Sequence, residues 1–208
     1  MIDPATLITY LLVLLGFVFI PGPAVLLTVA RATSSGTKAG LATGLGIAVG
    51  DLIHTMLAVI GLSAIILASA TLFTIIKYLG AAYLIYLGIR AILERAPAGL
   101  DIVSPRFTAG RAFRQAVILE VLNPKSALFF LAFLPQFVVP ENGMVALQLT
   151  TLGILFVLMG LLSTVVFALG AGGIGTFLRH NPVVLRWQGK VVGSIYCALG
   201  VRLALQER

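Results

Sequence analysis

The sequence predicts an all-α integral membrane protein with six transmembrane helices, arranged as two inverted three-helix repeats. Hydrophobic residues make up 60% of the 208 residues and charged residues only 10%, with a mean hydropathy of +1.10, which is too little polar surface for a soluble domain. Several apolar runs approach the roughly 20 residues that a helix needs to cross a bilayer. Two proline motifs interrupt apolar runs in the two halves of the chain.

Hydropathy divides the chain into six segments, at about 5–31, 39–68, 70–93, 112–138, 144–171 and 183–205. Acidic Asp3 precedes the first segment and no basic residue does, so we expect a permanent helix there and not a cleaved signal peptide. Residues 94–111, with two prolines and two glycines, form the expected linker. The chain is then one transporter domain, 1–208, with repeat one at about 1–93 and repeat two at about 112–208.

Proline breaks the first and fourth segments. Pro21, Gly22 and Pro23 lie inside the first apolar run, and Asn123, Pro124 and Lys125 lie inside the fourth. Proline removes a backbone donor and clashes with the preceding turn, so each motif frees polar backbone groups that hydrocarbon cannot satisfy. Such groups persist at membrane depth where they face protein or a wet cavity. Broken helices in corresponding places of two halves predict the binding site of a transporter.

An internal repeat links the last segments of the two halves. Five residues recur in order: Lys77, Gly80, Tyr83, Gly88 and Arg90 match Lys190, Gly193, Tyr196, Gly200 and Arg202. Because each half has three helices, an odd number, the second half enters the membrane from the opposite side. The two halves are therefore expected to form an inverted pair, although similar helix-packing composition could also produce the pattern.

The distribution of basic residues predicts the orientation. Ten of the fourteen lie in the first, third and fifth loops. The positive-inside bias places these loops in the cytoplasm and both termini outside it. The net charge of +7 is explained in this way, without a nucleic-acid partner.

Asp51 and His54 are the first candidate functional pair. Asp51 lies near the middle of the second segment, where an acid is costly unless it faces a partner or water. His54 follows three residues later, on the same helical face. Desolvation would favour the protonated acid, which suits proton exchange, and histidine titrates near neutrality. Alternatively the pair is a buried lock between helices. Glycines four apart, ending at Gly50, are expected to pack Asp51 against the first broken helix.

Glu120, Asn123, Pro124 and Lys125 form the second candidate cluster. Glu120 and Asn123 are three residues apart and could face one cavity. Lys125 adds a cation that could pair with Asp51 or a substrate carboxylate, or could instead extend to the membrane surface. Helix amino-termini and Lys125 favour a carboxylate, whereas free carbonyls and Asp51 favour an ammonium group, so an amino-acid-like substrate fits.

Several functions are disfavoured by what the sequence contains. Cys197 is the single cysteine, which excludes an intramolecular disulfide and a CxxC metal or redox motif. One acid and histidine pair without a third ligand does not make a metal site, and we expect no cofactor. An intramembrane enzyme would need a nucleophile with its base, and no catalytic serine motif is present. A chain this small could dimerise.

Five motifs together resemble the LysE/RhtB family of bacterial amino-acid exporters. They are Phe19–Ile20–Pro21–Gly22–Pro23; Gly50–Asp51; Tyr78–Leu79–Gly80–Ala81–Ala82–Tyr83; Asn123–Pro124–Lys125 followed by Leu128–Phe129–Phe130; and Gly200–Val201–Arg202. The resemblance covers nearly the whole chain. It implies a plasma-membrane exporter of amino acids or close derivatives that is coupled to the proton gradient.

The function expected from the sequence is therefore a secondary transporter that exports amino-acid-like molecules by proton antiport. The expected partners are this substrate, protons and membrane lipid, with Asp51 as proton carrier and with Lys125 and Asn123 as polar support. The alternative is a channel for a small solute or ion, which would keep the same helices without alternating access.

Overall fold

The computed structural model describes residues 2–19, 23–68, 70–93 and 106–205. This part of the chain is helical and has no strand. Its α-helices are α1 Pro4–Phe19, α2 Pro23–Ser35, α3 Thr37–Ala68, α4 Ala70–Leu93, α5 Ala109–Val121, α6 Pro124–Phe133, α7 Val145–Leu169, α8 Ala171–His180 and α9 Pro182–Leu205, with short 3₁₀ turns η1 at Leu134–Phe137 and η2 at Pro140–Asn142. The all-α fold class is confirmed.

The first apolar segment consists of two helices. Asp3 caps the start of α1, because its carboxylate accepts hydrogen bonds from the Thr6 backbone N–H (3.0 Å) and hydroxyl (2.6 Å). The bond from the Thr6 hydroxyl is the main reason why the pKa of Asp3 lies below its ordinary value. The axes of α1 and α2 differ by 42°. Pro21 and Gly22 lie outside the described residues, whereas Pro23 begins α2.

The fourth apolar segment is also two helices, as its sequence predicts. Thr108 caps α5, and α5 ends at Val121. Asn123 then precedes Pro124, the first residue of α6. Proline suits this position, because its missing N–H would have no partner in the first turn and its fixed φ already matches a helix. The Asn–Pro pair therefore ends one helix and begins the next.

The remaining predicted segments correspond to α3, α4, α7 and α9, with one difference. The chain continues after α7 as the separate helix α8, where the sequence analysis expected a connection. Among the described residues, α3 (over Thr37–Ile65) and α7 are long and apolar enough to cross a membrane, and the bent pair of α1 and α2 makes a third span if it counts as one.

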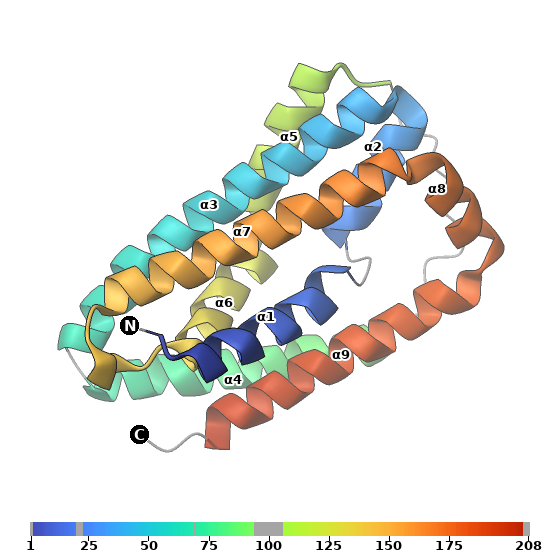
Figure 1. Ribbon diagram of the computed structural model, residues 1–208. Coiled ribbons are helices and arrows are strands. Elements are labelled where there is room, and N and C mark those ends of the chain that lie inside the picture. Colours follow the sequence, from blue (N-terminus) through green and yellow to red (C-terminus); the bar gives the residue numbers. More distant parts are fainter. Residues whose placement is uncertain (1, 20–22, 69, 94–105, 206–208) are drawn as a thin grey trace.

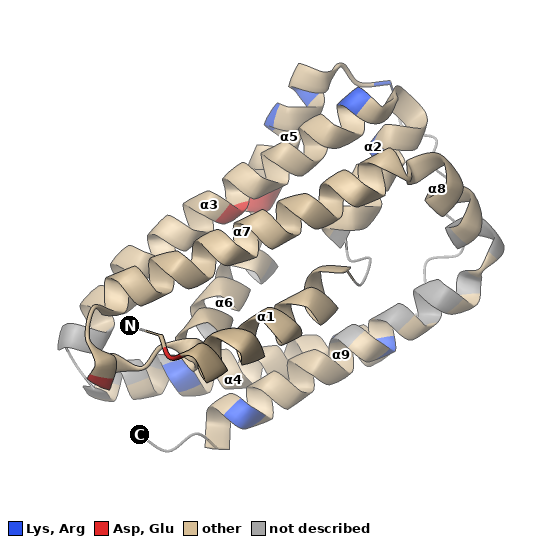
Figure 2. Ribbon diagram, in the orientation of Figure 1, with Lys and Arg blue, Asp and Glu red and all other residues tan. Residues whose placement is uncertain are grey.

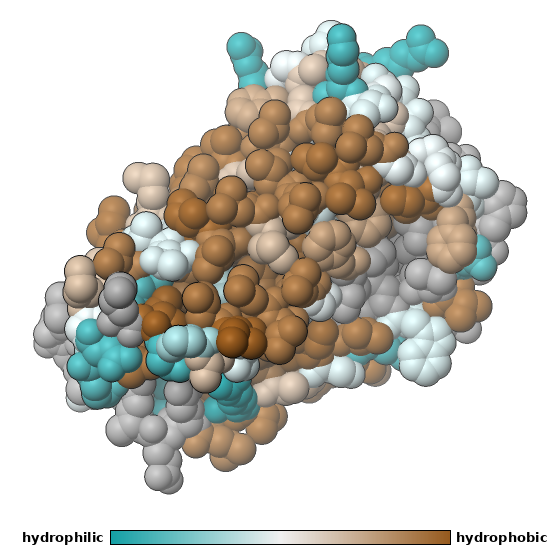
Figure 3. Space-filling view, viewed as in Figure 1, coloured by the Kyte–Doolittle hydropathy of each residue, from teal (hydrophilic) through white to brown (hydrophobic). Residues whose placement is uncertain are grey.

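The helices form an elongated bundle (Figure 1). α3 packs between α5 and α7, and α4 packs along α9 on the other side of the molecule. The described ends of the chain, the start of α1 and the end of α9, lie at the same end of the bundle. Figure 3 shows a hydrophobic surface over the middle of the bundle, with polar groups concentrated toward its two ends. These features describe a multi-pass membrane protein.

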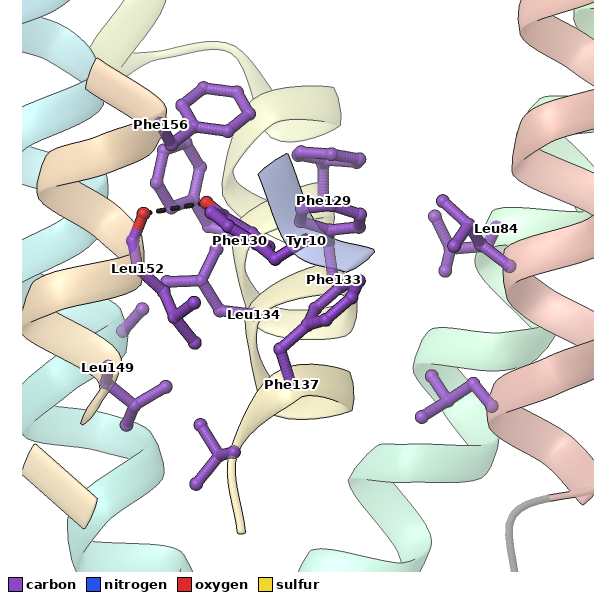
Figure 4. Packing of buried hydrophobic residues seen from close by; sticks show 14 of the residues in the cluster. Tyr10, Leu84, Phe129, Phe130, Phe133, Leu134, Phe137, Leu149, Leu152 and Phe156 are labelled. Atoms are coloured by element: carbon purple, nitrogen blue, oxygen red, sulfur yellow. Dashed lines mark hydrogen bonds between the residues drawn. The ribbon is translucent and has the colours of Figure 1, made fainter. Parts of the chain in front are cut away.

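Aromatic side chains fill the centre of the bundle (Figure 4). Phe129, Phe133 and Phe137 follow one another at four-residue spacing along α6 and η1, and each is buried. Tyr10 of α1 packs against Phe133 and Phe137, with ring centroids 5.7 and 5.0 Å apart. Its hydroxyl donates to the carbonyl of Leu152 in α7 (2.7 Å), so the polar end of this buried ring is satisfied.

Candidate functional site

A cavity of about 380 Å³ lies where the two broken segments meet α3 and α7. Its wall includes Phe17 near the end of α1, Ala24 near the start of α2, Glu120 near the end of α5 and Ser126 near the start of α6. The cavity therefore adjoins both helix breaks. Its volume is in the range of small-molecule sites in proteins.

Two acids line this cavity. Asp51 and Glu120 are only 6% and 9% exposed, and both lie in the cavity wall. The acidic residues of α3 and α5 appear in Figure 2 near the middle of the bundle, far from the charged groups at its ends. On the far side of Asp51, a Cβ added to Gly160 of α7 would lie 3.9 Å from the carboxylate oxygen Oδ2.

Glycine allows these two acids to approach. A Cβ added to Gly50 would lie 2.5 Å from the Glu120 Cβ and 2.7 Å from its Cγ, so α3 and α5 touch at this level without an intervening side chain. A Cβ on Gly46, one turn earlier, would lie 2.5 Å from the Phe113 carbonyl oxygen. Gly40, earlier in α3, does pack on Ala32 of α2 in the first broken segment, whereas Gly46 and Gly50 pack on α5. The expected contact with the first broken segment is therefore made at Gly40 and not at Gly46 and Gly50. Small residues allow such close approach wherever their partner is.

His54 holds the break of the fourth segment. Its Nε2 donates to the carbonyl of Glu120 (2.8 Å). In an unbroken helix that carbonyl would accept the N–H of residue 124, and Pro124 has none. The carbonyl also accepts the N–H of Asn123 (3.1 Å). His54 therefore shares the face of Asp51, as predicted, but it satisfies a backbone group that the proline leaves free.

A second side chain does the same at the first break. Ser163 of α7 is 1% exposed, and its hydroxyl donates to the carbonyl of Val18 in the last turn of α1 (2.8 Å). This carbonyl belongs to the four at a helix end that have no partner within the helix. Each break thus receives a donor from the second long helix of the opposite half of the chain.

Aromatic rings form another part of the cavity wall. The rings of Phe17 and Phe129 stack with centroids 4.8 Å apart, and Phe156 packs 5.7 Å from Phe129. Tyr196 of α9 lies 5.6 Å from Phe17, edge to face. All four line the cavity. A ligand here would meet both carboxyl groups and aromatic rings.

The predicted site residues divide into three groups. Asp51, Glu120 and Asn123 line the cavity, and His54 contacts the backbone beside it. Asn123 is also placed to start α6, since its amide donates to the Ser126 hydroxyl (2.9 Å). Pro23, Pro124 and Lys125 lie in the first turns of α2 and α6, and their side chains are outside the described part of the structure, as are Pro21 and Gly22 entirely.

Sequence reasoning missed the aromatic wall and the hydroxyl of Ser163. The phenylalanines lie in apolar runs where hydropathy does not distinguish a cavity wall from a lipid-facing residue. Ser163 and Thr164 are adjacent hydroxyls inside a very apolar helix, and that signal could have identified them. Within the described residues, no group of three or more His, Cys, Asp or Glu could hold a metal ion.

Comparison with known proteins identifies the family of this chain. The sequence matches the family described as LysE type translocator over residues 15–207. It is 32% identical to an uncharacterized membrane protein of Vibrio cholerae, over 95% of both chains. It is 32% identical to a homoserine/homoserine lactone efflux protein of Salmonella typhi, over 80% of this chain and 77% of that protein. It is 34% identical to a leucine efflux protein of Salmonella choleraesuis, over 65% of this chain and 66% of that protein.

No solved structure matches this chain. The family match covers both helix breaks, every residue that lines the cavity, and the α4 and α9 pair. The chain belongs to the LysE type translocator family, and it is a transporter and not an enzyme.

Proposed function

We propose that this protein is a secondary transporter that exports amino acids or close derivatives from the cytoplasm in exchange for protons. The observation that carries the proposal is the cavity beside both helix breaks with the buried carboxyl group of Asp51 in its wall. Relatives named as efflux proteins for homoserine, homoserine lactone and leucine support a substrate of this kind.

Asp51 is the proposed proton carrier. A buried carboxyl group can exist protonated and neutral in one state and charged in the other, and the change alters what else the cavity can bind. Asn123 and Lys125 are the proposed polar support at the start of α6, and the breaks at Pro21–Pro23 and Pro124 provide the backbone groups of the site. His54 and Ser163 are positioning residues, because they bond the carbonyls that the breaks expose.

Six spans in two inverted repeats form the proposed architecture, with repeat one at about 1–93 and repeat two at about 112–208. Support comes from α4 and α9. These helices run antiparallel, since Gly88 lies against Gly193 while Gly200 lies against Ala81. Exchanging the two halves by the sequence repeat converts the Gly88–Gly193 contact into one between Gly200 and Gly80, next to Ala81. A two-fold axis between α4 and α9 would produce this pattern.

The hydrogen bonds at the two breaks also support inverted repeats. His54 of the first half bonds the backbone of Glu120 in the second half, and Ser163 of the second half bonds the backbone of Val18 in the first. A pseudo-two-fold axis relates such pairs of contacts, as in other transporters built from inverted repeats.

Packing beyond the cavity favours a carrier over a channel. Toward η1, Phe133 and Phe137 are buried beyond the cavity-lining Phe129. Toward the basic end, Arg31 of α2 donates to the Gln115 amide oxygen of α5 (3.2 Å), one turn beyond the cavity. A channel would need a continuous path, whereas a carrier needs a site that opens to one side at a time.

The proposed location is the bacterial inner (plasma) membrane, with the hydrophobic surface of Figure 3 against lipid. Basic residues gather at the end of the bundle where α2 ends and α3 and α5 begin (Figure 2), and the positive-inside rule would place this end in the cytoplasm. Both termini would then lie outside the cytoplasm.

The test is uptake of labelled amino acids into inside-out vesicles, with and without an acidified lumen. Wild-type protein should accumulate one class of amino acid when the gradient is present. Asp51→Asn should lose this accumulation while inserting normally. Glu141→Gln, which changes an exposed acid in η2, serves as the matched control and should behave as wild type. Gradient-driven accumulation by Asp51→Asn would disprove the proton role, and no accumulation of any amino acid would disprove the exporter.

A further inference from the structure

Glu120 is a second buried carboxyl group in the cavity, and the proton role of Asp51 does not account for it. It lies in the last full turn of α5, 9% exposed, with its Cβ and Cγ packed directly on Gly50. Both acids lie in the cavity wall, Asp51 on α3 and Glu120 on α5. They therefore approach one bound molecule from two different helices.

Neither carboxylate has a hydrogen-bond donor or an ion-pair partner among the described residues, although both are at least nine-tenths buried. A buried charge without a partner is strongly unfavourable. If one acid carries a proton, the other still needs a positive group. A cationic ligand that contacts the carboxyl groups of both Asp51 and Glu120 would supply it.

The rest of the described wall offers no positive side chain. No Lys, Arg or His side chain is among the residues that the structure places around the cavity. The neutral polar groups come from Asn123, Ser126, Ser163 and Thr164, and aromatic rings form much of the remaining wall. An ammonium group therefore has two specific partners, and an apolar body can lie against the rings. A ligand carboxylate would meet two acids of like charge.

We infer that Asp51 and Glu120 together bind the ammonium group of the substrate, and that the substrate class is a primary amine with a small apolar body whose carboxyl group is dispensable. Amides, esters and lactones of small amino acids belong to this class along with the amino acids themselves. This inference rests on the proposed function and adds the group that the site recognises.

The test is binding to the purified full-length protein in detergent, measured by isothermal titration calorimetry with three probes. Leucine carries both groups, leucinamide keeps the amine and lacks the carboxylate, and N-acetylleucine keeps the carboxylate and lacks the amine. Leucinamide should bind at least as tightly as leucine, and N-acetylleucine should bind about tenfold more weakly or worse, since it loses a hydrogen-bonded charge. Tighter binding of N-acetylleucine than of leucinamide, or no binding of leucinamide, would overturn the inference.

Variants separate recognition from folding. Glu120→Gln should weaken leucinamide binding about tenfold, and should reduce the preference for leucinamide over leucine because a repulsive charge near the leucine carboxylate is gone. Glu120→Asp should recover part of the affinity, and Glu141→Gln should change nothing. An unchanged ratio of the two affinities in Glu120→Gln would assign Glu120 to structure alone and refute its role in recognition.

The outcomes for this inference and for the proposed function remain distinct. Export of leucine in vesicles combined with no binding of leucinamide would refute the ammonium site and support the exporter function. Failure to accumulate any amino acid would refute the exporter function, whether or not leucinamide binds.

Discussion

The contact of Gly50 with Glu120 predicts that one added methyl group will disturb the site. In Gly50→Ala the new Cβ would lie 2.5 Å from the Glu120 Cβ. Carbon atoms in contact lie about 3.5–4.0 Å apart, so α3 and α5 must separate locally by roughly 1 Å. Overpacking of this kind costs about 1–3 kcal/mol of folding free energy. The separation would also move Glu120 relative to Asp51.

Gly61→Ala is the matched control, because Gly61 lies in the same helix and an added Cβ would meet nothing within 4 Å. Alanine improves helix propensity over glycine by about 1 kcal/mol at either position. This gain cancels when the two variants are compared. The difference between their unfolding free energies therefore isolates the packing cost, and we expect Gly50→Ala to be less stable than Gly61→Ala by about 2 kcal/mol.

The assay is reversible unfolding in mixed detergent micelles, followed by vesicle uptake for both variants. Gly61→Ala should transport as wild type does, and Gly50→Ala should lose most of its uptake. Equal unfolding free energies for the two variants would show that α3 and α5 do not touch at Gly50. Normal uptake by a destabilised Gly50→Ala would show that the spacing of the two acids is not needed for transport.

Two further predictions concern groups that hold helix ends. His54→Leu removes the side-chain donor to the Glu120 carbonyl, which then accepts only the Asn123 N–H. The unfolding free energy in detergent should fall by about 1 kcal/mol. An unchanged unfolding free energy would contradict a stabilising His54 hydrogen bond. The pKa of Asp3 is lowered in the folded protein, so its cap stabilises the fold fully above the unfolded pKa, and this stabilisation is lost as pH falls through the lower folded pKa. NMR of the Thr6 amide across this pH range should detect the loss. An Asp3 pKa at or above its ordinary value would contradict the prediction.

Much of the fold follows from hydropathy and proline. The apolar runs predicted the long helices, and the prolines predicted where two of the runs divide, because Pro124 cannot donate to the Glu120 carbonyl. Helix α8 was not predicted, since its short, glycine-rich sequence carries a signal that is typical of a connection. The local sequence alone does not distinguish a short helix from a connection in such a segment.

The cavity was predictable in its two acidic residues and not in its aromatic walls. Acids in the middle of apolar helices are conspicuous, so Asp51 and Glu120 could be identified without a structure. Phe17, Phe129 and Phe156 could not, because their convergence depends on how α1, α6 and α7 cross. The role of His54 depends on a carbonyl 66 residues away, which no local pattern reveals.

α1 and α5, the first helices of the two proposed repeats, differ in how extensively they pack on the long helix of their own half. α5 packs along α3 because Gly46 and Gly50 leave room for its backbone and for Glu120. α1 contacts α7 much less extensively than α5 contacts α3. α1 is joined to α7 by hydrogen bonds at Tyr10 and Ser163. Movement of α1 against α7 would therefore break few packed contacts, whereas movement of α5 against α3 would break many, so α1 is the helix expected to move when the cavity opens.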